Sequence, residues 1–202
     1  MMQELYKKHR PKTLKGVVGN RPTKKALTNM LQRGTLPHTI LFHGPSGCGK
    51  TTLARILTTE LGCHALDFHE MNSSSERGIA TFRQIQNEMY LAPTGSCRIY
   101  LLDEAHKLTS DAQNAALKML EDTPEHVYFF LCTTDSNRLI PALRNRCTEM
   151  PVTLLDDERL GVLLRRVTNK EKIELTEDVE DALLEVSNGS ARALLVHLER
   201  IS

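Results

Sequence analysis

The sequence predicts an α/β fold followed by a small helical domain, and three observations lead to this prediction. Short apolar segments alternate with longer helical patterns up to about residue 150, as in a parallel sheet with crossover helices. A glycine-rich loop at residues 44–51 joins one of these strands to one of these helices. After Pro151 only helical patterns remain. We therefore expect an α/β domain over residues 1–150 and a three-helix lid domain over residues 151–202.

The expected strands are short and mostly apolar, and they cover Thr39–His43, Ala65–Met71, Arg98–Leu102, Val127–Thr133 and Cys147–Met150. The expected helices show apolar residues at helical spacing and cover Thr51–Leu61, Ile79–Tyr90, Ser110–Leu120, Asp156–Thr168, Glu177–Val186 and Ala191–Ile201. Ser110, Thr176 and Ser190 stand where a side chain can cap a helix N-terminus.

Charge and cysteine content restrict the class of protein. The net charge is +1, with basic residues concentrated in residues 1–25 and acidic residues in 151–202. This asymmetry is consistent with steering of a polyanion and equally with two solvated surfaces. The five cysteines form no C-x-x-C pair, which argues against a disulfide framework and a zinc ribbon. With no membrane-length apolar segment and no signal peptide, a reducing, cytoplasmic location is expected.

The strongest motif is Gly44–Thr51, GPSGCGKT, which matches the full phosphate-binding pattern G-x-x-x-x-G-K-[ST]. Its glycines allow backbone N–H groups to turn around phosphate oxygens, and the following helix directs its N-terminus at the same anion. Lys50 would contact the β- and γ-phosphates, and Thr51 would offer a hydroxyl to Mg²⁺. A glycine-rich turn without a ligand is the alternative, but the strand before the loop and the helix after it favour the phosphate-binding interpretation.

A second motif, RIYLLDEAH at Arg98–His106, places two carboxylates at the end of a buried strand. Ligands of open parallel sheets bind at this edge. Asp103 would hold Mg²⁺, and Glu104 would polarise the attacking water as general base. By itself an acidic pair after a strand is usually a solvated turn, but the upstream phosphate-binding loop favours the functional interpretation.

Several further segments, in order, resemble the clamp-loader ATPases of the AAA+ superfamily, the family of the bacterial gamma/tau subunit and the replication factor C small subunit. The resemblance covers Tyr6–Ile201. It lacks the zinc module of gamma/tau after Cys63 and ends before the family's collar domain. The segments are KHRP at Lys8–Pro11, VVG at Val17–Gly19, NSSSERGI at Asn72–Ile79, PEHV at Pro124–Val127 and LCTTD at Leu131–Asp135.

The resemblance implies a five-stranded parallel sheet, ATP and Mg²⁺ as ligands, and roles for individual residues. Thr134 matches sensor 1, although a strand-end threonine is often only a cap. Arg146, in Asn145-Arg146-Cys147, matches the arginine that reaches the ATP of a neighbouring subunit, with a surface salt bridge as the alternative role and Arg144 as a competitor. The nucleotide-binding residues it implies are His9, Arg10, Pro11, Val17, Val18, Gly44, Pro45, Ser46, Gly47, Cys48, Gly49, Lys50, Thr51, Thr52 and the sensor 2 residue Arg192.

The function implied by the resemblance is ATP-driven loading of a sliding clamp onto primer–template DNA. The partners would be the clamp, other clamp-loader subunits or copies of this chain, and DNA bound without sequence preference through Arg77 and Arg83. An arginine on a helix is as often only a solvated charge. Alternatives are another DNA-processing ATPase, such as a helicase loader or branch-migration motor, and an ATP-gated assembly module that does not hydrolyse ATP.

Overall fold

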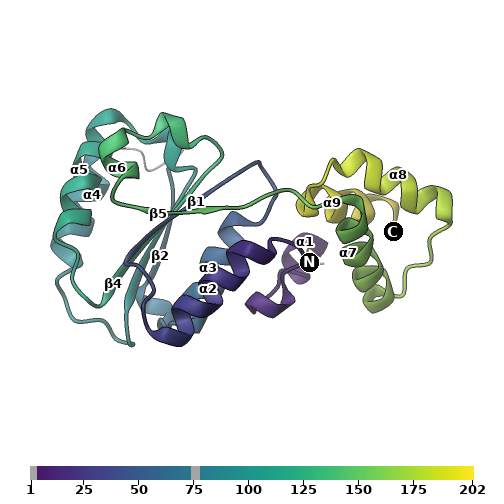
Figure 1. Cartoon of the computed structure of the whole chain (residues 1–202), viewed down its shortest axis with the longest axis horizontal. Coiled ribbons are helices and arrows are strands. Elements are labelled where there is room, and N and C mark those ends of the chain that lie inside the picture. Colours follow the sequence, from purple (N-terminus) through teal and green to yellow (C-terminus); the bar gives the residue numbers. More distant parts are fainter. Residues whose placement is uncertain (1–3, 74–77) are drawn as a thin grey trace.

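The structure is a computed structural model that describes residues 4–73 and 78–202. A five-stranded parallel sheet forms its centre, with strand order β2-β3-β4-β1-β5 (Figure 1). The expected five-stranded parallel sheet is thereby confirmed. The strands are β1 (Thr39–His43), β2 (Phe68–Asn72), β3 (Arg98–Asp103), β4 (Val127–Thr133) and β5 (Thr148–Pro151).

Helices cover both faces of the sheet. On one side Leu27 and Leu53 belong to an apolar cluster with Phe42 and Phe130, and on the other Phe82 and Met119 pack around Tyr100 and Phe129. Because successive strand residues point to opposite faces, the buried strands serve both clusters. The first side carries α2 (Arg21–Arg33) and α3 (Lys50–Glu60), and the second carries α4 (Ile79–Glu88), α5 (Ser110–Glu121) and α6 (Pro141–Arg144) (Figure 1).

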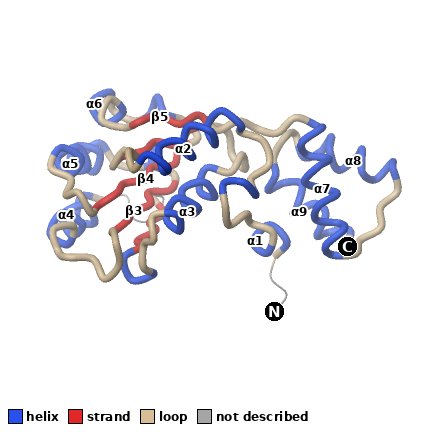
Figure 2. The backbone as a smooth tube through the Cα atoms, turned by 60° about the horizontal axis from the view of Figure 1, so that its bottom comes forward, coloured by secondary structure: helices blue, strands red, loops and turns tan. Residues whose placement is uncertain are grey.

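The last part of the chain is helical, as predicted. It contains α7 (Asp157–Glu171), α8 (Glu177–Ser187) and α9 (Ala191–Ile201), which bury a separate cluster that includes Leu160, Leu164, Leu194 and Leu198. The short N-terminal helix α1 (Leu5–Lys8) joins this cluster through Leu5 and lies between the sheet and α7–α9 (Figure 2). The N-terminal segment therefore packs against the C-terminal helices and not only against the sheet.

Four sequence predictions were wrong in detail. Helix α2 was missed, although Pro22 in its first turn and a left-handed Gly34 at its C-cap are helix boundary signals. The strand expected from Ala65 begins at Phe68, because Ala65–Asp67 forms a 3₁₀ turn. The cap of α5 is Thr109, whose hydroxyl accepts a hydrogen bond from the Ala112 N–H, and not Ser110. Thr176 begins α8 without a capping bond from its side chain.

The parallel register determines where the motifs meet. β1 pairs with β4 from Thr39↔Phe129 to His43↔Thr133, and β4 pairs with β3 up to Leu131↔Leu102. The loop after β1 and the carboxylates that end β3 therefore lie at the same edge of the sheet.

Candidate nucleotide-binding site

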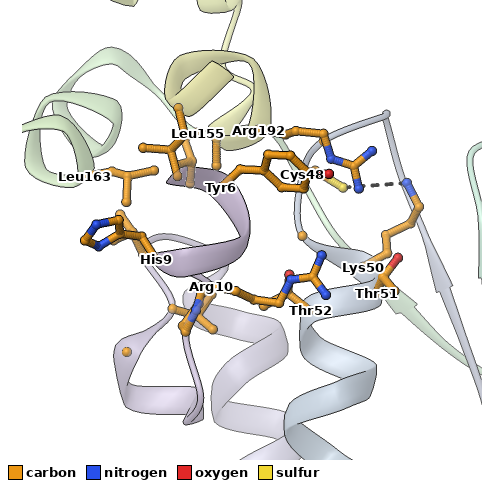
Figure 3. Close-up of a pocket in the computed structure, with 18 of the residues that line it drawn as sticks. Tyr6, His9, Arg10, Cys48, Lys50, Thr51, Thr52, Leu155, Leu163 and Arg192 are labelled. Carbon is orange, nitrogen blue, oxygen red and sulfur yellow. Dashed lines mark hydrogen bonds between the residues drawn. The ribbon is translucent and has the colours of Figure 1, made fainter. Parts of the chain in front are cut away.

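A pocket of about 410 Å³ opens at this edge, between the sheet and the C-terminal helices (Figure 3). The pocket is lined by the N-terminal segment, the loop and first turn after β1, the end of β3, Leu155, and helices α7 and α9. A cleft with walls from two packed units is a common place for ligands, because it surrounds a small molecule on several sides.

The loop after β1 is held in a curled conformation by glycines. Gly44 has φ +149°, and a Cβ there would lie 1.9 Å from the carbonyl oxygen of Val152. Its N–H donates to the carbonyl of Thr133 at 3.2 Å, which fixes the loop to the end of β4. Gly47 and Gly49 also have positive φ, a backbone conformation that glycine adopts without strain. The loop then enters α3 at Lys50, whose first turn faces the pocket.

Lys50 is buried and folds back over this loop. Its Nζ donates to the carbonyl oxygens of Gly44 at 2.8 Å and Pro45 at 2.7 Å, and lies 4.0 Å from Sγ of Cys48 (Figure 3). Weak partners of this kind leave an ammonium charge that a phosphate oxygen would neutralise far better.

Thr51 and Asp103 bring the two motifs together. The Thr51 hydroxyl donates to Asp103 Oδ2 at 2.9 Å, and Asp103 Oδ1 accepts from the Glu104 N–H at 2.9 Å. A hydroxyl and a carboxylate side by side are oxygen ligands of the kind that Mg²⁺ prefers, so these two residues fit a magnesium ion. Glu104 has a left-handed backbone (φ +56°), and its carboxylate lies 3.2 Å from His106 Nε2 and 3.5 Å from Lys107 Nζ.

The start of α9 touches the phosphate-binding loop directly. A Cβ on Gly47 would lie only 2.1 Å from the Ser190 hydroxyl, which also caps α9 by accepting from the Ala193 N–H at 3.2 Å. Two residues further on, Arg192 lines the pocket, and its guanidinium stands 5.8 Å from the centre of the Tyr6 ring (Figure 3). The loop and the helix that carries Arg192 are therefore in contact.

The N-terminal segment forms the wall of the pocket that faces the phosphate-binding loop, and polar contacts hold it against α7. Lys8 Nζ lies 2.6 Å, and His9 Nε2 2.5 Å, from the two carboxylate oxygens of Glu171. Hydrogen bonds from Lys8 and His9 hold the pKa of Glu171 below its usual value. Arg166 adds a second tie by donating to the carbonyl of Gly16 at 2.8 Å. These bonds fix α7 to the segment that faces the loop across the pocket.

The pocket is strongly cationic. Burial lowers the pKa of Arg10, and the nearby guanidinium groups of Arg55 and Arg192 lower it further. Among the residues that the structure describes, only two carboxylates line the pocket, those of Asp103 and Glu104. The basic residues in its wall are Lys8, Arg10, Lys12, Lys50, Arg166, Lys170 and Arg192. Such an excess of positive charge suits a polyphosphate.

The structure brings together most of the predicted nucleotide-binding residues. All of them line the pocket except Gly44 and Pro45, whose carbonyls hold Lys50. Thr134 directly follows β4, is exposed and does not line the pocket, and Arg146 lies outside it on the surface. Arg83 is exposed on α4, and Arg77 lies outside the described residues.

Sequence reasoning missed several residues in the pocket wall. Tyr6, Arg166 and Lys170 line it, as do the apolar side chains of Leu163 and Val167. Arg166 and Lys170 are four residues apart on α7, which is the spacing of one helix face. This spacing was a usable signal, but nothing in the sequence indicated that this face meets the phosphate-binding loop.

Apart from Cys48, which also lines the pocket, the cysteines lie outside the site. Cys48, Cys97 and Cys132 are buried as free thiols, whereas Cys63 and Cys147 are partly buried. Burial raises the pKa of Cys63 and of Cys147 to about 12. Within residues 4–73 and 78–202 no three histidine, cysteine or acidic side chains gather into a metal-binding group. The helices of that part of the chain are too short or too polar to span a membrane.

A model of the family described as "ATPase family associated with various cellular activities (AAA)" matches residues 40–153, which contain both motifs. The chain belongs to this AAA family. Membership means that this AAA domain is a nucleotide-binding domain.

Individual proteins are similar to nearly the whole chain and not only to the part that the family model matches. DNA polymerase III subunit gamma/tau of Mycobacterium tuberculosis (strain CDC 1551 / Oshkosh) is 31% identical, with 98% of this chain and 38% of that protein aligned. Subunit gamma of Buchnera aphidicola subsp. Schizaphis graminum is 31% identical (98% and 60%), and subunit tau of Escherichia coli (strain K12) is 33% identical (96% and 33%). The chain thus spans between about a third and three fifths of these relatives.

Solved structures agree with the AAA fold. The Thermotoga maritima RuvB Holliday junction branch migration motor superposes with a TM-score of 0.75 at 24% identity, over 95% of this chain and 64% of that one. At this level of identity the likeness concerns the fold, including the α7–α9 helices, and not the activity.

Proposed function

We propose that this chain is an ATP-hydrolysing subunit of a clamp loader, which places a ring-shaped sliding clamp onto primer–template DNA in an intracellular replication complex. The observation that carries the proposal is the pocket in which the phosphate-binding loop, the β3 carboxylates and Arg192 of α9 meet. The similarity to DNA polymerase III gamma and tau subunits, over 96–98% of this chain, supports the choice of clamp loading among AAA functions.

Different residues of the pocket bind the phosphates, the magnesium ion, the attacking water and the base. The loop N–H groups and Lys50 bind the phosphates, and Thr51 and Asp103 hold the magnesium ion, which neutralises phosphate charge when bound. Glu104 orients water and takes its proton, because it follows Asp103 in the chain and lines the same pocket. Thr134, which directly follows the adjacent strand β4 and is exposed, would act as a polar sensor of the γ-phosphate. The base lies against His9, Pro11, Val17 and Val18.

Arg192 couples the nucleotide to the C-terminal helices. We treat residues 1–150 and 151–202 as two domains whose relative angle changes with the ligand. Gly47 touches Ser190, and the ion pairs of Glu171 with Lys8 and His9 join α7 to the N-terminal segment. A triphosphate that draws Arg192 toward the loop would pull α9 with it, so that ATP and ADP favour different angles.

Two exposed arginines would contact partners, one a neighbouring subunit and the other DNA. Arg146 is exposed on the surface away from this chain's own pocket, as expected of a residue that acts on the ATP of a neighbouring subunit. Arg83 on α4 is exposed and would contact the DNA backbone together with Arg77, without reading sequence. The neighbours are other clamp-loader subunits or copies of this chain.

The test is the ATPase rate across protein concentration, with and without primed DNA and the cognate clamp. The wild type is expected to become more active with concentration and with DNA plus clamp, and the Glu104→Gln and Arg146→Ala variants to lose at least a hundredfold. Activity indifferent to the clamp and to Arg146→Ala would leave an ATP site but would contradict clamp loading. ATP binding without phosphate release under any condition would indicate an assembly module.

A further inference from the structure

The segment that carries Arg146 has a rigid backbone. Between α6 and β5 the N–H of Asn145 donates to the Pro141 carbonyl at 2.9 Å, that of Arg146 to Leu143 at 3.2 Å, and that of Cys147 to Arg144 at 2.9 Å. The Cα of Arg146 is therefore fixed relative to the sheet. The long side chain has several rotatable bonds, so without further contacts its guanidinium could occupy many positions.

Two groups from different elements hold the end of this side chain. Arg146 Nη2 forms an ion pair with Glu121 Oε1, and Nη1 donates to the Ala142 carbonyl oxygen at 3.3 Å. Glu121 is the last residue of α5, where the helix dipole also favours a cation. A guanidinium has five N–H donors, so two are used here and three remain for another ligand.

Stability does not explain this ion pair. The Arg146 and Glu121 side chains are 38% and 45% exposed, and exposed pairs contribute little to folding because water screens them. The ion pair instead fixes the orientation of the Arg146 guanidinium. A pre-oriented arginine contributes more to a transition state than a mobile one, since its ordering is complete before the reaction begins.

We propose that Glu121 is a positioning residue for Arg146, which it holds ready for the ATP of the adjacent subunit. This inference rests on the proposed function, because it requires Arg146 to act across a subunit interface. Glu121 touches neither the nucleotide nor the reacting atoms in this account. Its carboxylate and the Ala142 carbonyl orient one edge of the guanidinium and leave the rest for the neighbour's phosphate.

A second pair nearby supplies a matched control. Arg144 Nε lies 3.2 Å from Glu149 Oε1, and its Nη1 donates to Asn137 Oδ1 at 3.3 Å. The Arg144 and Glu149 side chains are 33% and 36% exposed, so the second pair also joins an arginine to a half-exposed carboxylate, and Glu149 lies in addition 3.5 Å from His43 Nε2. Glu149→Ala therefore tests for a general effect of losing a surface carboxylate in this region.

The experiment mixes two variants of the full chain that are each inactive alone. Glu104→Gln subunits have a disabled ATP site but an intact Arg146, and Arg146→Ala subunits have the reverse, so ATP hydrolysis in the mixture reports only sites shared between them. We then add Glu121→Ala either to the subunit that supplies Arg146 or to the subunit that supplies the ATP site. Thermal melts of each variant confirm that it is folded.

The expected result is asymmetric. Glu121→Ala in the subunit that supplies Arg146 lowers the rate about tenfold, and Glu121→Gln, which keeps a hydrogen-bond acceptor, lowers it less. The same change in the other subunit, and Glu149→Ala in either, leaves the rate unchanged. Equal losses in both subunits, no loss, or a faster rate would overturn the positioning role. An inactive parent mixture beside an active wild type would instead overturn the action of Arg146 across the interface, and this inference with it.

Discussion

The Thr51 hydroxyl donates a hydrogen bond to Asp103 Oδ2 at 2.9 Å, and this single contact joins the phosphate-binding loop to the end of β3. The two residues are 52 positions apart in the chain. They meet because β1 and β3 are parallel strands on either side of β4, with their carboxyl ends at one edge.

Asp103→Asn should remove the magnesium dependence of the site. The amide keeps the shape and a hydrogen-bond acceptor but not the charge, so hydrolysis should fall about a hundredfold while ATP binding in EDTA changes little. Titration of ATP with and without Mg²⁺ checks this. Asp135→Asn, at an exposed position two residues after the neighbouring strand β4, is the control. Equal weakening with and without Mg²⁺ would show that Asp103 serves only to support the loop.

Gly47→Ala should separate the loop from α9. The added methyl carbon would lie 2.1 Å from the Ser190 hydroxyl, on a backbone with φ +74°. Gly49→Ala is a matched control, since its φ is +106° but no atom lies within 4 Å of the new carbon. We expect ATP affinity to fall at least tenfold further for Gly47→Ala than for Gly49→Ala, because about 1.4 kcal/mol of clash is enough for that ratio. Similar affinities would contradict the close contact.

Arg98→Met should strongly destabilise the fold. The guanidinium donates to the carbonyls of Leu91 and Ala92 at 3.3 and 3.5 Å and to the carboxylate of Asp67 at 3.3 Å, and Asp67 is only 1% exposed. Removing one partner of a buried pair leaves the other charge without compensation, which costs about 3–5 kcal/mol. Urea unfolding measures the loss. Arg98→Met combined with Asp67→Asn should lose less than the sum of the two single variants.

Glu171→Gln should weaken the attachment of the N-terminal segment to α7, and the loss of stability should depend on pH. Lys8 and His9 lower the pKa of Glu171 in the folded state, so its stabilisation is complete above the unfolded pKa of about 4.3 and disappears as the pH falls through the folded value. The melting temperature of the variant should therefore be lower than that of the wild type at pH 7, with the difference closing below about pH 4. A difference independent of pH would contradict the ion pair. Glu174→Gln, at an exposed position three residues on, is the control.

Local sequence signals were sufficient for the two motifs and most of the elements. Gly44–Thr51 has a fixed spacing that one short turn satisfies, and the strand before it is a continuous apolar run. The missed helix α2 shows where such signals fail. Leu27, Met30 and Leu31 recur at helical spacing and pack on the core, but most of the helix is polar and its first turns belong to the basic stretch that suggested a charged surface.

The other half of the pocket depends on tertiary packing. Arg166 and Lys170 reach it only because Leu5, Tyr6 and Val18 dock on the α7–α9 cluster and bring α7 over the loop. No local pattern encodes the position of two segments that are about 150 residues apart in the chain. The same reason explains why the Glu121–Arg146 pair, which joins α5 to the loop before β5, was visible only in the structure.

The most direct test of the central claim is ATP and ADP binding by calorimetry to the wild type and to the Lys50→Ala and Arg192→Ala variants. If ATP lies in the pocket between the loop and α9, Lys50→Ala should weaken both nucleotides at least a hundredfold. Arg192→Ala should weaken ATP about tenfold more than ADP, because only ATP carries the γ-phosphate that Arg192 would reach. Unchanged affinities in both variants would contradict the account, since the nucleotide would then have to bind elsewhere.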